Sequence, residues 1–196
     1  MKRCFDIVVS LIILSVFLPF GILIALAIKL DSKGTIFYRQ ERVGKNGKVF
    51  RLLKFRTMRT DADKAGKLTV GMRDPRITRI GYFLRKTKLD EFTQFWNVLI
   101  GDMSIVGPRP EVQEYVNLYT PQQREILTVR PGITDYASLE YFHENEILGA
   151  AENPRETYIH EVMPAKLDLN KKYLQNPTLL HDLKLMWMTF VKVLKG

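Results

Sequence analysis

The longest run of apolar positions lies near the amino terminus. Residues 7–28 (IVVSLIILSVFLPFGILIALAI) carry no charge, and a helix of this length can cross a membrane. A signal peptide fits less well, because its apolar core usually runs to about 7–15 residues. The pattern therefore predicts a membrane-embedded segment over residues 1–30 and a more polar domain over residues 31–196.

Pro19 lies near the middle of this segment and predicts a bend. Proline cannot donate a hydrogen bond to the carbonyl of Ser15, its ring clashes there, and Gly21 eases the bend. Both flanks are basic, with Lys2 before the segment and Lys29 after it, so the positive-inside rule gives no orientation. A re-entrant helix and a plain spanning helix are equally compatible with these features.

Beyond residue 30 the pattern changes to short elements. Alternation predicts two strands, at 35–44 and 47–57, and the Asn46-Gly47 pair between them is a typical hairpin signal. The other predicted elements are polar loops at 61–68 and 73–76, a short helix at 77–85, a loop at 101–111, helices at 112–119 and 121–128, a turn at 130–132 and an amphipathic helix at 178–195. Residues 136–154 show no clear periodicity. The predicted fold class is α+β, mostly helical, with a small β-hairpin.

One longer helix is predicted to start in the stretch KLDEFTQFWN, residues 88–97. Apolar positions recur there at spacings of three and four residues; they are Leu89, Phe92, Phe95, Trp96 and Leu99. Thr87 and Asp90 resemble a capping box, which would place Asp90 and Glu91 in the first turn, where the helix dipole favours negative charge. In the helix at 178–195, Trp187 beside lysines suits a membrane interface, although core packing explains the same pattern.

Composition narrows the partners and the chemistry. The net charge is +9 and the pI about 9.6, which favours anionic partners such as phosphate-bearing substrates or acidic membranes. Cys4 is the single cysteine, so an internal disulfide framework and a Cys-rich zinc site are excluded. Three scattered histidines argue against a His-based metal site, which leaves carboxylates as ligands for a hard cation.

Nine basic residues and a single acidic one, Glu41, lie between positions 33 and 59. Attraction to anionic lipid headgroups accounts for part of this charge. Strand alternation also places Lys54 and Arg56 on one face, where they would suit a bound diphosphate.

The adjacent carboxylates Asp90 and Glu91 are the strongest candidates for chemistry. Such a pair is more often a solvated helix start, a cap or an ion-pair partner. Here it opens an apolar helix between Arg85 and Arg109, and the sequence offers no Gly-rich phosphate loop or Ser/His/Asp set. We therefore expect a carboxylate nucleophile that acts on phosphorus, with Mg²⁺ and arginines neutralising the phosphoryl charge.

Several ordered motifs resemble those of the bacterial sugar transferase family, the monotopic polyprenyl-phosphate phosphoglycosyl transferases. They are LPFGILIALAIKLDSKGTIFYRQERVG, LLKFRTM, RKTKLDEFTQFWNVLIGDMSIVGPRPE and VRPGIT, with a similar close, DLKLMWMTFVKVLK. The likeness runs, with gaps, over residues 2–134. The chain is similar to the minimal form of the family, without extra membrane helices.

The resemblance implies that a UDP-sugar gives its sugar 1-phosphate to undecaprenyl phosphate and that UMP leaves, at the first membrane step of glycoconjugate assembly. Asp90 would be the nucleophile of a covalent phosphosugar intermediate. Glu91 would assist, by positioning Mg²⁺ (or Mn²⁺) or by handling a proton, so both carboxylates are expected metal ligands. The expected substrate-binding residues are Lys54, Arg56, Arg85, Pro108, Arg109 and Pro110, of which the last three match a loop associated with the nucleotide.

The resemblance also implies that the helix is re-entrant and broken at Pro19. The domain would then lie on the cytoplasmic face of the bacterial inner membrane, with membrane lipids, downstream glycosyltransferases and a second copy of the chain as candidate partners. Leu18 stands where the family usually has Ser, and Ser15 is a partial substitute. Residues 135–149 (DYASLEYFHENEILG) also depart from the family pattern, and we expect them to bear on the choice of sugar, which the sequence does not name.

Other function classes remain open from the sequence. A membrane-anchored protein that binds anionic ligands explains the charge and the anchor, but not the acidic pair. A phosphohydrolase would use the same nucleophile with water as acceptor, and a non-catalytic scaffold would tolerate Asp90→Asn. No motif indicates a nucleic-acid partner.

Overall fold

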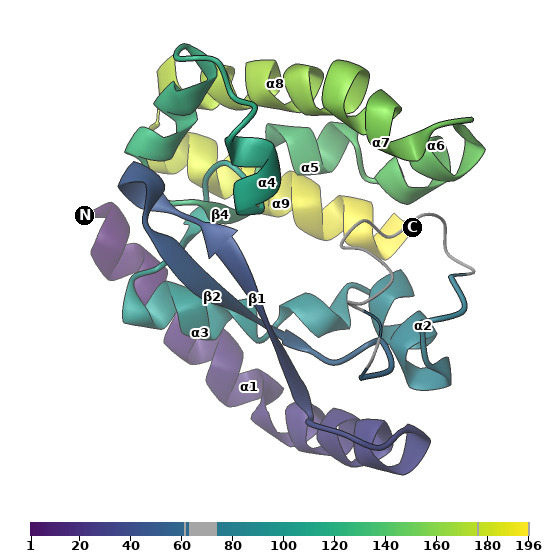
Figure 1. Cartoon of the computed structure of the whole chain (residues 1–196). Helices are drawn as coiled ribbons and strands as arrows, with labels where there is room; N and C mark the ends of the chain where they lie inside the picture. The colour runs from purple at the N-terminus through teal and green to yellow at the C-terminus, as the bar shows by residue number, and fades with distance from the viewer. Residues whose placement is uncertain (61, 63–73, 176, 196) are drawn as a thin grey trace.

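The computed structural model describes residues 1–60, 62, 74–175 and 177–195, shown in Figure 1. In chain order the elements are α1 (Lys2–Asp31), β1 (Phe37–Val43), the 3-10 turn η1 (Lys45–Gly47), β2 (Val49–Phe55), α2 (Arg79–Lys86), the 3-10 turn η3 (Leu89–Glu91), α3 (Gln94–Ile100), β3 (Ser104–Val106), α4 (Gln113–Val116), the 3-10 segment η4 (Gln123–Thr128), β4 (Gly132–Thr134), α5 (Tyr136–Glu140), α6 (Glu144–Ala150), α7 (Pro154–Thr157), the π-helical turn η5 (Tyr158–Val162), α8 (Met163–Gln175) and α9 (Leu179–Lys195). The predicted mostly helical α+β class is confirmed. Apart from residue 62, the predicted loop at 61–68 lies outside the described residues, as does residue 73.

Helix α1 exposes an unusual amount of apolar surface. Its side chains include Val16 and Leu23, which are 66% and 64% exposed, and its buried residues are Asp6, Ser10 and Ile28. In the described part of the chain it is the one helix long and apolar enough to cross a membrane. Because exposed apolar surface of this extent is unfavourable in water, the helix indicates association with a membrane.

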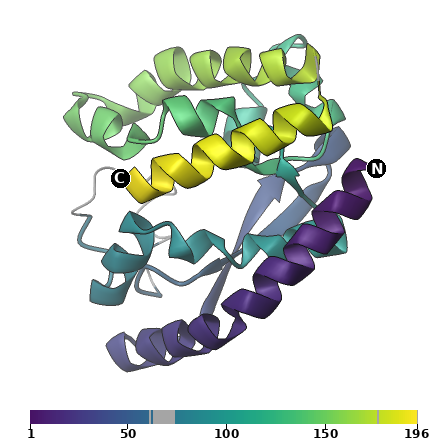
Figure 2. The same cartoon turned by 180° about the vertical axis from the view of Figure 1, so that it is seen from behind.

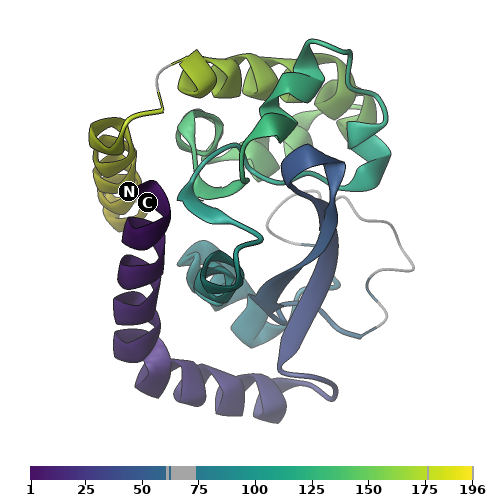
Figure 3. The same cartoon turned by 90° about the vertical axis from the view of Figure 1, so that its left-hand side faces the viewer.

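A sharp bend divides α1 into two limbs, as Figure 3 shows. Pro19 lies inside the helix, and it removes the hydrogen bond to the Ser15 carbonyl, which weakens the helix at the predicted place. The bend supports the re-entrant interpretation, and the path through a membrane stays a prediction.

Polar contacts hold the amino-terminal turns of α1 against distant parts of the chain. The Lys2 ammonium pairs with the Asp182 carboxylate of α9 and donates to the Tyr173 hydroxyl, with an Nζ–Oη distance of 3.0 Å. The Asp6 carboxylate accepts a 2.8 Å hydrogen bond from the Ser104 hydroxyl of β3. The first turns of α1 therefore pack against the rest of the same chain. The predicted domain boundary at residue 30 stays a prediction.

The predicted hairpin is confirmed. Strands β1 and β2 pair antiparallel from Phe37–Phe55 to Val43–Val49. The turn between them contains two residues with positive φ, Asn46 at 56° and Gly47 at 77°, a conformation that asparagine and glycine adopt most readily. The local sequence signal was therefore sufficient to place this element.

The single helix predicted from Asp90 onward is wrong. The chain instead forms the short turn η3 (Leu89–Glu91) and then the separate helix α3 (Gln94–Ile100). Thr87 does not cap a following helix, because its hydroxyl donates to the Phe83 carbonyl and so ends α2. Lys88 then takes a left-handed conformation, with φ of 57°, which reverses the chain direction ahead of the acidic pair.

The predicted loop at 101–111 contains a strand that sequence reasoning missed. Strands β3 and β4 pair in parallel through three residues each, too few for a periodic pattern to appear. Gly107 and Gly132 meet at the end of this pair. A Cβ on Gly132 would lie 2.1 Å from the backbone nitrogen of Gly107, so this close approach requires glycine.

The helices of the second half lie at the turn end of the hairpin, where η4 contacts η1 and α4 contacts β1. Of the predicted helices at 112–119 and 121–128, only Gln113–Val116 is α-helical, and Gln123–Thr128 forms a 3-10 segment. Residues 154–175 form a near-continuous helical run, α7–η5–α8, for which sequence reasoning made no prediction. Buried side chains of α4, α6 and α8 form the largest core cluster.

The amphipathic helix predicted at 178–195 is confirmed as α9. Asp182 and Leu185 face inward, whereas Leu180, Trp187, Phe190 and Leu194 are 55–77% exposed. Figures 2 and 3 show α9 on the same side of the molecule as the amino-terminal limb of α1. The two helices therefore present their apolar side chains on one side of the protein.

Candidate active site

The acidic pair lies on a tight turn between two helices, not inside one. Asp90 is only 6% exposed. The backbone reversal at Lys88 directs the pair toward the hairpin, because η3 contacts both β2 and α2. The pair is therefore held by the packing of three elements.

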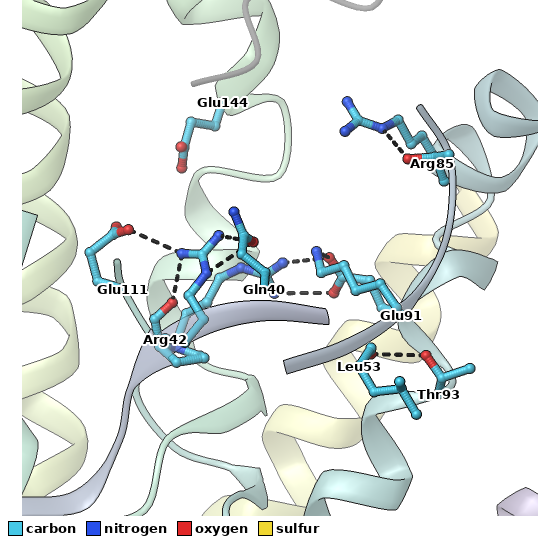
Figure 4. Close-up of polar contacts among 12 residues, drawn as sticks. Gln40, Arg42, Leu53, Arg85, Glu91, Thr93, Glu111 and Glu144 are labelled. Atoms are coloured by element: carbon cyan, nitrogen blue, oxygen red, sulfur yellow. Dashed lines mark hydrogen bonds and ion pairs between the residues drawn. The ribbon is translucent and has the colours of Figure 1, made fainter. Parts of the chain in front are cut away.

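Lys54 of β2 reaches Glu91 across this packing. Its ammonium lies 3.0 Å from Glu91 Oε1. Two side chains of the segment after η3 hold β2 in place. The Thr93 hydroxyl donates to the Leu53 carbonyl at 2.9 Å, as Figure 4 shows. Asn97 Oδ1 accepts from the Leu53 N–H at 2.9 Å. These bonds set the position of the lysine beside the acidic pair.

Arg109 also contacts Glu91, from the loop after β3. Its guanidinium donates to both carboxylate oxygens, with an Nη1–Oε2 distance of 3.1 Å and a second bond to Oε1. The Arg109 backbone N–H donates to Asp135 Oδ2 at 2.8 Å, and Asp135 also caps helix α5. The glycine contact between β3 and β4 brings these two segments together.

Pro108 and Pro110 flank Arg109 and are both buried. The Pro108 carbonyl accepts from the Gly132 N–H at 3.0 Å, and the Pro110 carbonyl accepts from Arg42 at 3.0 Å. The two prolines therefore hold the loop while the arginine between them points to Glu91. Their predicted contact with a nucleotide stays a prediction.

The two carboxylates differ in their electrostatic environments. Burial raises the pKa of Asp90, and Lys54 opposes that rise in part. Burial acts to raise the pKa of Glu91 as well, but Arg109 and Lys54 together hold it well below its usual value. Within the described part of the chain, the Asp90 carboxylate accepts no side-chain hydrogen bond. Glu91 is thus a paired anion and Asp90 an unpaired buried carboxylate.

Arg85 completes the basic surroundings of Asp90. Its Nε donates to the Thr57 hydroxyl at 3.0 Å, and Figure 4 shows the guanidinium on the far side of Glu91 from Arg42. Burial lowers the pKa of Arg85, and Asp90 acts in the opposite direction. The terminal amino groups of Arg85 donate to no described residue, so they remain available to a ligand.

Arg56, predicted to bind substrate beside Lys54, has other partners. It is buried, and it donates to the carbonyls of Lys33 and Ser32 at 2.8 and 2.7 Å, at the carboxyl end of α1. Strand β2 ends at Phe55, so the alternation that predicted a shared face no longer applies. In the structure Arg56 thus stabilises the end of α1, and its predicted contact with substrate stays a prediction.

No group of three His, Cys, Asp or Glu side chains suited to a metal is present among the described residues. Both Glu91 oxygens contact Lys54 or Arg109, which argues against the predicted role of Glu91 as a direct metal ligand. The Asp90 carboxylate has free oxygens, and Mg²⁺ is often held by one carboxylate together with substrate phosphates. Asp90 is therefore the described residue that would hold a magnesium ion, which would neutralise charge on a bound diphosphate.

Sequence reasoning missed the residues that position this site. Asn97, Thr93 and Asp135 are small polar residues whose partners lie 26–44 positions away in sequence, and no local pattern reports such contacts. The predicted residues Lys54, Asp90, Glu91 and Arg109 do come together.

Comparison with known proteins places this site in a family context. The sequence model described as "Bacterial sugar transferase" matches residues 1–196. The exopolysaccharide production protein PSS of Rhizobium leguminosarum bv. phaseoli is 37% identical over 202 residues, covering 99% of this chain and 95% of that protein.

Two further relatives carry more specific names. The UDP-glucose:undecaprenyl-phosphate glucose-1-phosphate transferase of Escherichia coli (strain K12) is 35% identical, over 98% of this chain and 40% of its own length. The UDP-N-acetylgalactosamine-undecaprenyl-phosphate N-acetylgalactosaminephosphotransferase of Aeromonas hydrophila is also 35% identical, over 100% of this chain and 44% of its own length. The chain thus spans less than half of these two proteins.

Proposed function

The chain belongs to the bacterial sugar transferase family, and on this premise we propose that it transfers a sugar 1-phosphate from a UDP-sugar to undecaprenyl phosphate, with release of UMP. The observation that carries the proposal is Asp90, a buried carboxylate without a hydrogen-bond partner among the described residues, surrounded by Lys54, Arg85 and the Arg109–Glu91 pair. Undecaprenyl phosphate and UDP-sugars are named in the relatives that match most of this chain.

In the first half of the reaction, an oxygen of the Asp90 carboxylate attacks the phosphorus that bears the sugar. A bond forms between this oxygen and phosphorus, the bond to the bridging oxygen of the diphosphate breaks, and UMP leaves with the bonding electrons. Arg85 and Arg109 are placed to neutralise the charge that develops on the phosphoryl oxygens.

In the second half, a phosphate oxygen of undecaprenyl phosphate attacks the same phosphorus. The acyl phosphate bond to Asp90 breaks, the carboxylate is regenerated, and the product is a lipid diphosphate sugar. A carboxylate is a suitable leaving group, because the acyl phosphate is an activated intermediate. The product suits an initiating step of glycan assembly on the membrane.

Glu91 supports this chemistry by holding cations. Its oxygens accept from Lys54 and Arg109, and its depressed pKa keeps it ionised. A group in this state is a poor proton carrier near neutral pH. Of the two roles predicted for Glu91, positioning of the cationic groups is therefore the one that we propose.

A magnesium ion held by Asp90 and the donor diphosphate fits the free oxygens described above. When bound, it supplies charge neutralisation of the diphosphate. Lys54 and Arg109 are held in place by Glu91, so they can orient the phosphates of the donor.

We further propose that the domain lies on the cytoplasmic face of the bacterial inner membrane, with α1 entering and returning to the same side at the bend near Pro19. Helix α9, whose exposed side chains include Leu180, Trp187 and Leu194, lies on the same side of the molecule as the first limb of α1, which suits an interfacial helix. This placement would bring Asp90 near the level at which a lipid phosphate is found.

The test uses the purified chain in detergent with Mg²⁺, undecaprenyl phosphate and a panel of UDP-sugars, and measures UMP release beside an Asp90→Asn variant. UMP release that requires the lipid and is lost in the variant supports the proposal. UMP release without the lipid indicates a phosphohydrolase. If no donor yields UMP, the proposal is wrong and the membrane-anchored binder of anionic ligands stays open as the alternative.

A further inference from the structure

A cavity lies directly beyond Arg109, on the side away from Glu91. It has a volume of about 200 Å³. In Figure 4 the carboxylates of Glu111 and Glu144 lie on this side, with Arg42. Elements from both halves of the chain line the cavity, and the lining residues used below are Arg109, Glu111, Glu144, Asn145, Tyr158 and Asn170. Arg109 lines the cavity and also contacts Glu91, so it connects the cavity to the acidic pair.

The charges of the lining indicate which part of a ligand would enter. The two glutamates of the lining are already paired, Glu111 with Arg42 at 3.1 Å and Glu144 with Lys166 at 2.5 Å. Their charges therefore largely cancel within the cavity, whereas the terminal amino groups of Arg85 donate to no described side chain and attract a phosphate group. A neutral group rich in hydroxyls suits carboxylate and amide partners, which accept its hydrogen bonds. The site is thus divided into a cationic half for phosphates and a polar half for a neutral group.

One lining residue has an unmet hydrogen-bonding requirement. Asn170 is 4% exposed, and its Oδ1 atom is buried without a hydrogen-bond partner. A buried acceptor left unpaired is unfavourable, and a ligand that donates to it removes that cost. The half-buried Asn145 makes no side-chain hydrogen bond to any described residue, and Glu144 uses Oε2 for Lys166 at 2.5 Å. Acceptors and donors are therefore available for a ligand.

We propose that this cavity holds the sugar of the donor and that Asn145 and Asn170 select it through hydrogen bonds to its hydroxyl or acetamido groups. This inference rests on the proposed function. Glu144 and Asn145 belong to residues 135–149, the segment that we expected to bear on the choice of sugar.

The uridine is the other neutral part of the donor, and the lining suits it less well. A base is usually held between open ring faces. Here the Tyr115 and Tyr158 rings pack against each other, with centroids 4.8 Å apart. The Tyr158 hydroxyl donates to Glu111, so neither the ring nor its hydroxyl is free to bind a base.

The experiment measures binding rather than turnover, so that it does not depend on the chemistry. In an Asp90→Asn background, the donor is not consumed. Titration calorimetry then gives the Kd values of UDP-glucose, UDP-galactose, their N-acetylhexosamine counterparts and UMP, for Asn145→Ala and Asn170→Ala. Asn117→Ala, an exposed asparagine outside the cavity, is the matched control.

We expect each cavity variant to weaken the best-bound UDP-sugar by about tenfold, the effect of one lost hydrogen bond. In the two cavity variants, the differences in Kd between the four UDP-sugars should become smaller, while the Kd of UMP stays unchanged. All Kd values of the Asn117→Ala variant should equal those of its Asp90→Asn parent. If UMP weakens by the same factor, the cavity holds the uridine and the inference is wrong. If neither ligand responds, the cavity is not part of the donor site and the inference is also wrong.

Folding is checked by thermal unfolding of each variant. If Asn170→Ala fails to fold, Asn145→Ala decides the result, because that side chain is half-buried and supports no described hydrogen bond. The proposed function is tested separately, by lipid-dependent UMP release from the chain with Asp90 intact. If UMP release is absent but the cavity variants still bind sugars less selectively, the proposed function fails. If UMP release is present but the cavity variants bind every sugar unchanged, the inference about the cavity fails.

Discussion

Two buried polar clusters join distant parts of this chain, and they differ in one respect. At the start of α1, the Asp182 carboxylate is 2% exposed and is satisfied by Lys2 and by the Tyr173 hydroxyl at 2.8 Å. At the turn η3, Glu91 is satisfied in the same way by Lys54 and Arg109. Its neighbour Asp90 accepts no side-chain hydrogen bond from the residues that the structure describes. The comparison teaches that a fully paired cluster serves the fold, whereas an unpaired buried carboxylate retains its reactivity.

The largest expected effect comes from Asp90→Asn. If Asp90 is the nucleophile, lipid-dependent UMP release should fall by roughly 10³-fold or more. The melting temperature should not fall, because the substitution removes a buried charge that accepts no hydrogen bond from a described side chain. Initial-rate assays and thermal unfolding in the same detergent measure both quantities. If the variant is stable and fully active, the unpaired Asp90 is not the reactive carboxylate and the contrast between the two clusters is wrong.

Arg109→Lys is expected to have the next largest effect. Lysine keeps the charge but loses the two-point contact with Glu91, and it cannot span both carboxylate oxygens and a phosphate. UMP release should fall by roughly 10²-fold. Arg124→Lys, an exposed arginine far from the acidic pair in sequence, is the control. Equal rates for the two variants would remove Arg109 from the proposed mechanism.

Asp182→Asn tests the paired cluster. Removing the charge leaves the Lys2 ammonium without its counterion, and we expect the free energy of unfolding to fall by about 2 kcal/mol, less than for a fully buried pair because Lys2 is 36% exposed. The kcat of the folded fraction should equal that of the unsubstituted protein. Urea unfolding beside Asp168→Asn, an exposed aspartate, provides the measurement. Loss of kcat with stability unchanged would show that this cluster also serves the chemistry.

The smallest expected effect is a shift in pH dependence. Asp90 must be ionised to attack, and burial raises its pKa, so the rate should rise with pH above the usual range of an aspartate. Lys54 opposes that rise, and Lys54→Gln should therefore raise the pKa of Asp90 further and move the acid limb of kcat/KM to higher pH. The limb should not move in Lys48→Gln. A shift to lower pH would contradict the assigned position of Lys54.

Local signals predicted several elements of the fold. The hairpin follows from alternation and from the Asn46-Gly47 pair, the bend follows from Pro19, and α9 follows from its apolar periodicity. Each depends on residues within one turn or one helix face. The failures have a common cause as well: β3 and β4 have three residues each, and the break at Lys88 requires a left-handed residue that no local rule assigns to lysine.

Part of the site was also predictable from features that the sequence shows directly. Residue chemistry and motif order singled out Asp90, Glu91, Lys54 and Arg109 before any geometry was available. Arg56 was grouped with Lys54 by strand alternation, but the strand ends at Phe55 and the side chain serves α1 instead.

The sequence by itself determined the membrane-type helix and its weak point, the hairpin, the family and the four charged residues of the site, because these depend on composition, short-range periodicity and ordered motifs. Only the tertiary structure decided which carboxylate is paired, since that depends on Lys54 and Arg109 arriving from β2 and from the loop after β3. It also decided that Asn145 and Asn170, 25 positions apart in the sequence, line one cavity. Pairing and cavity walls are properties of packing between distant segments, and a linear pattern does not contain them.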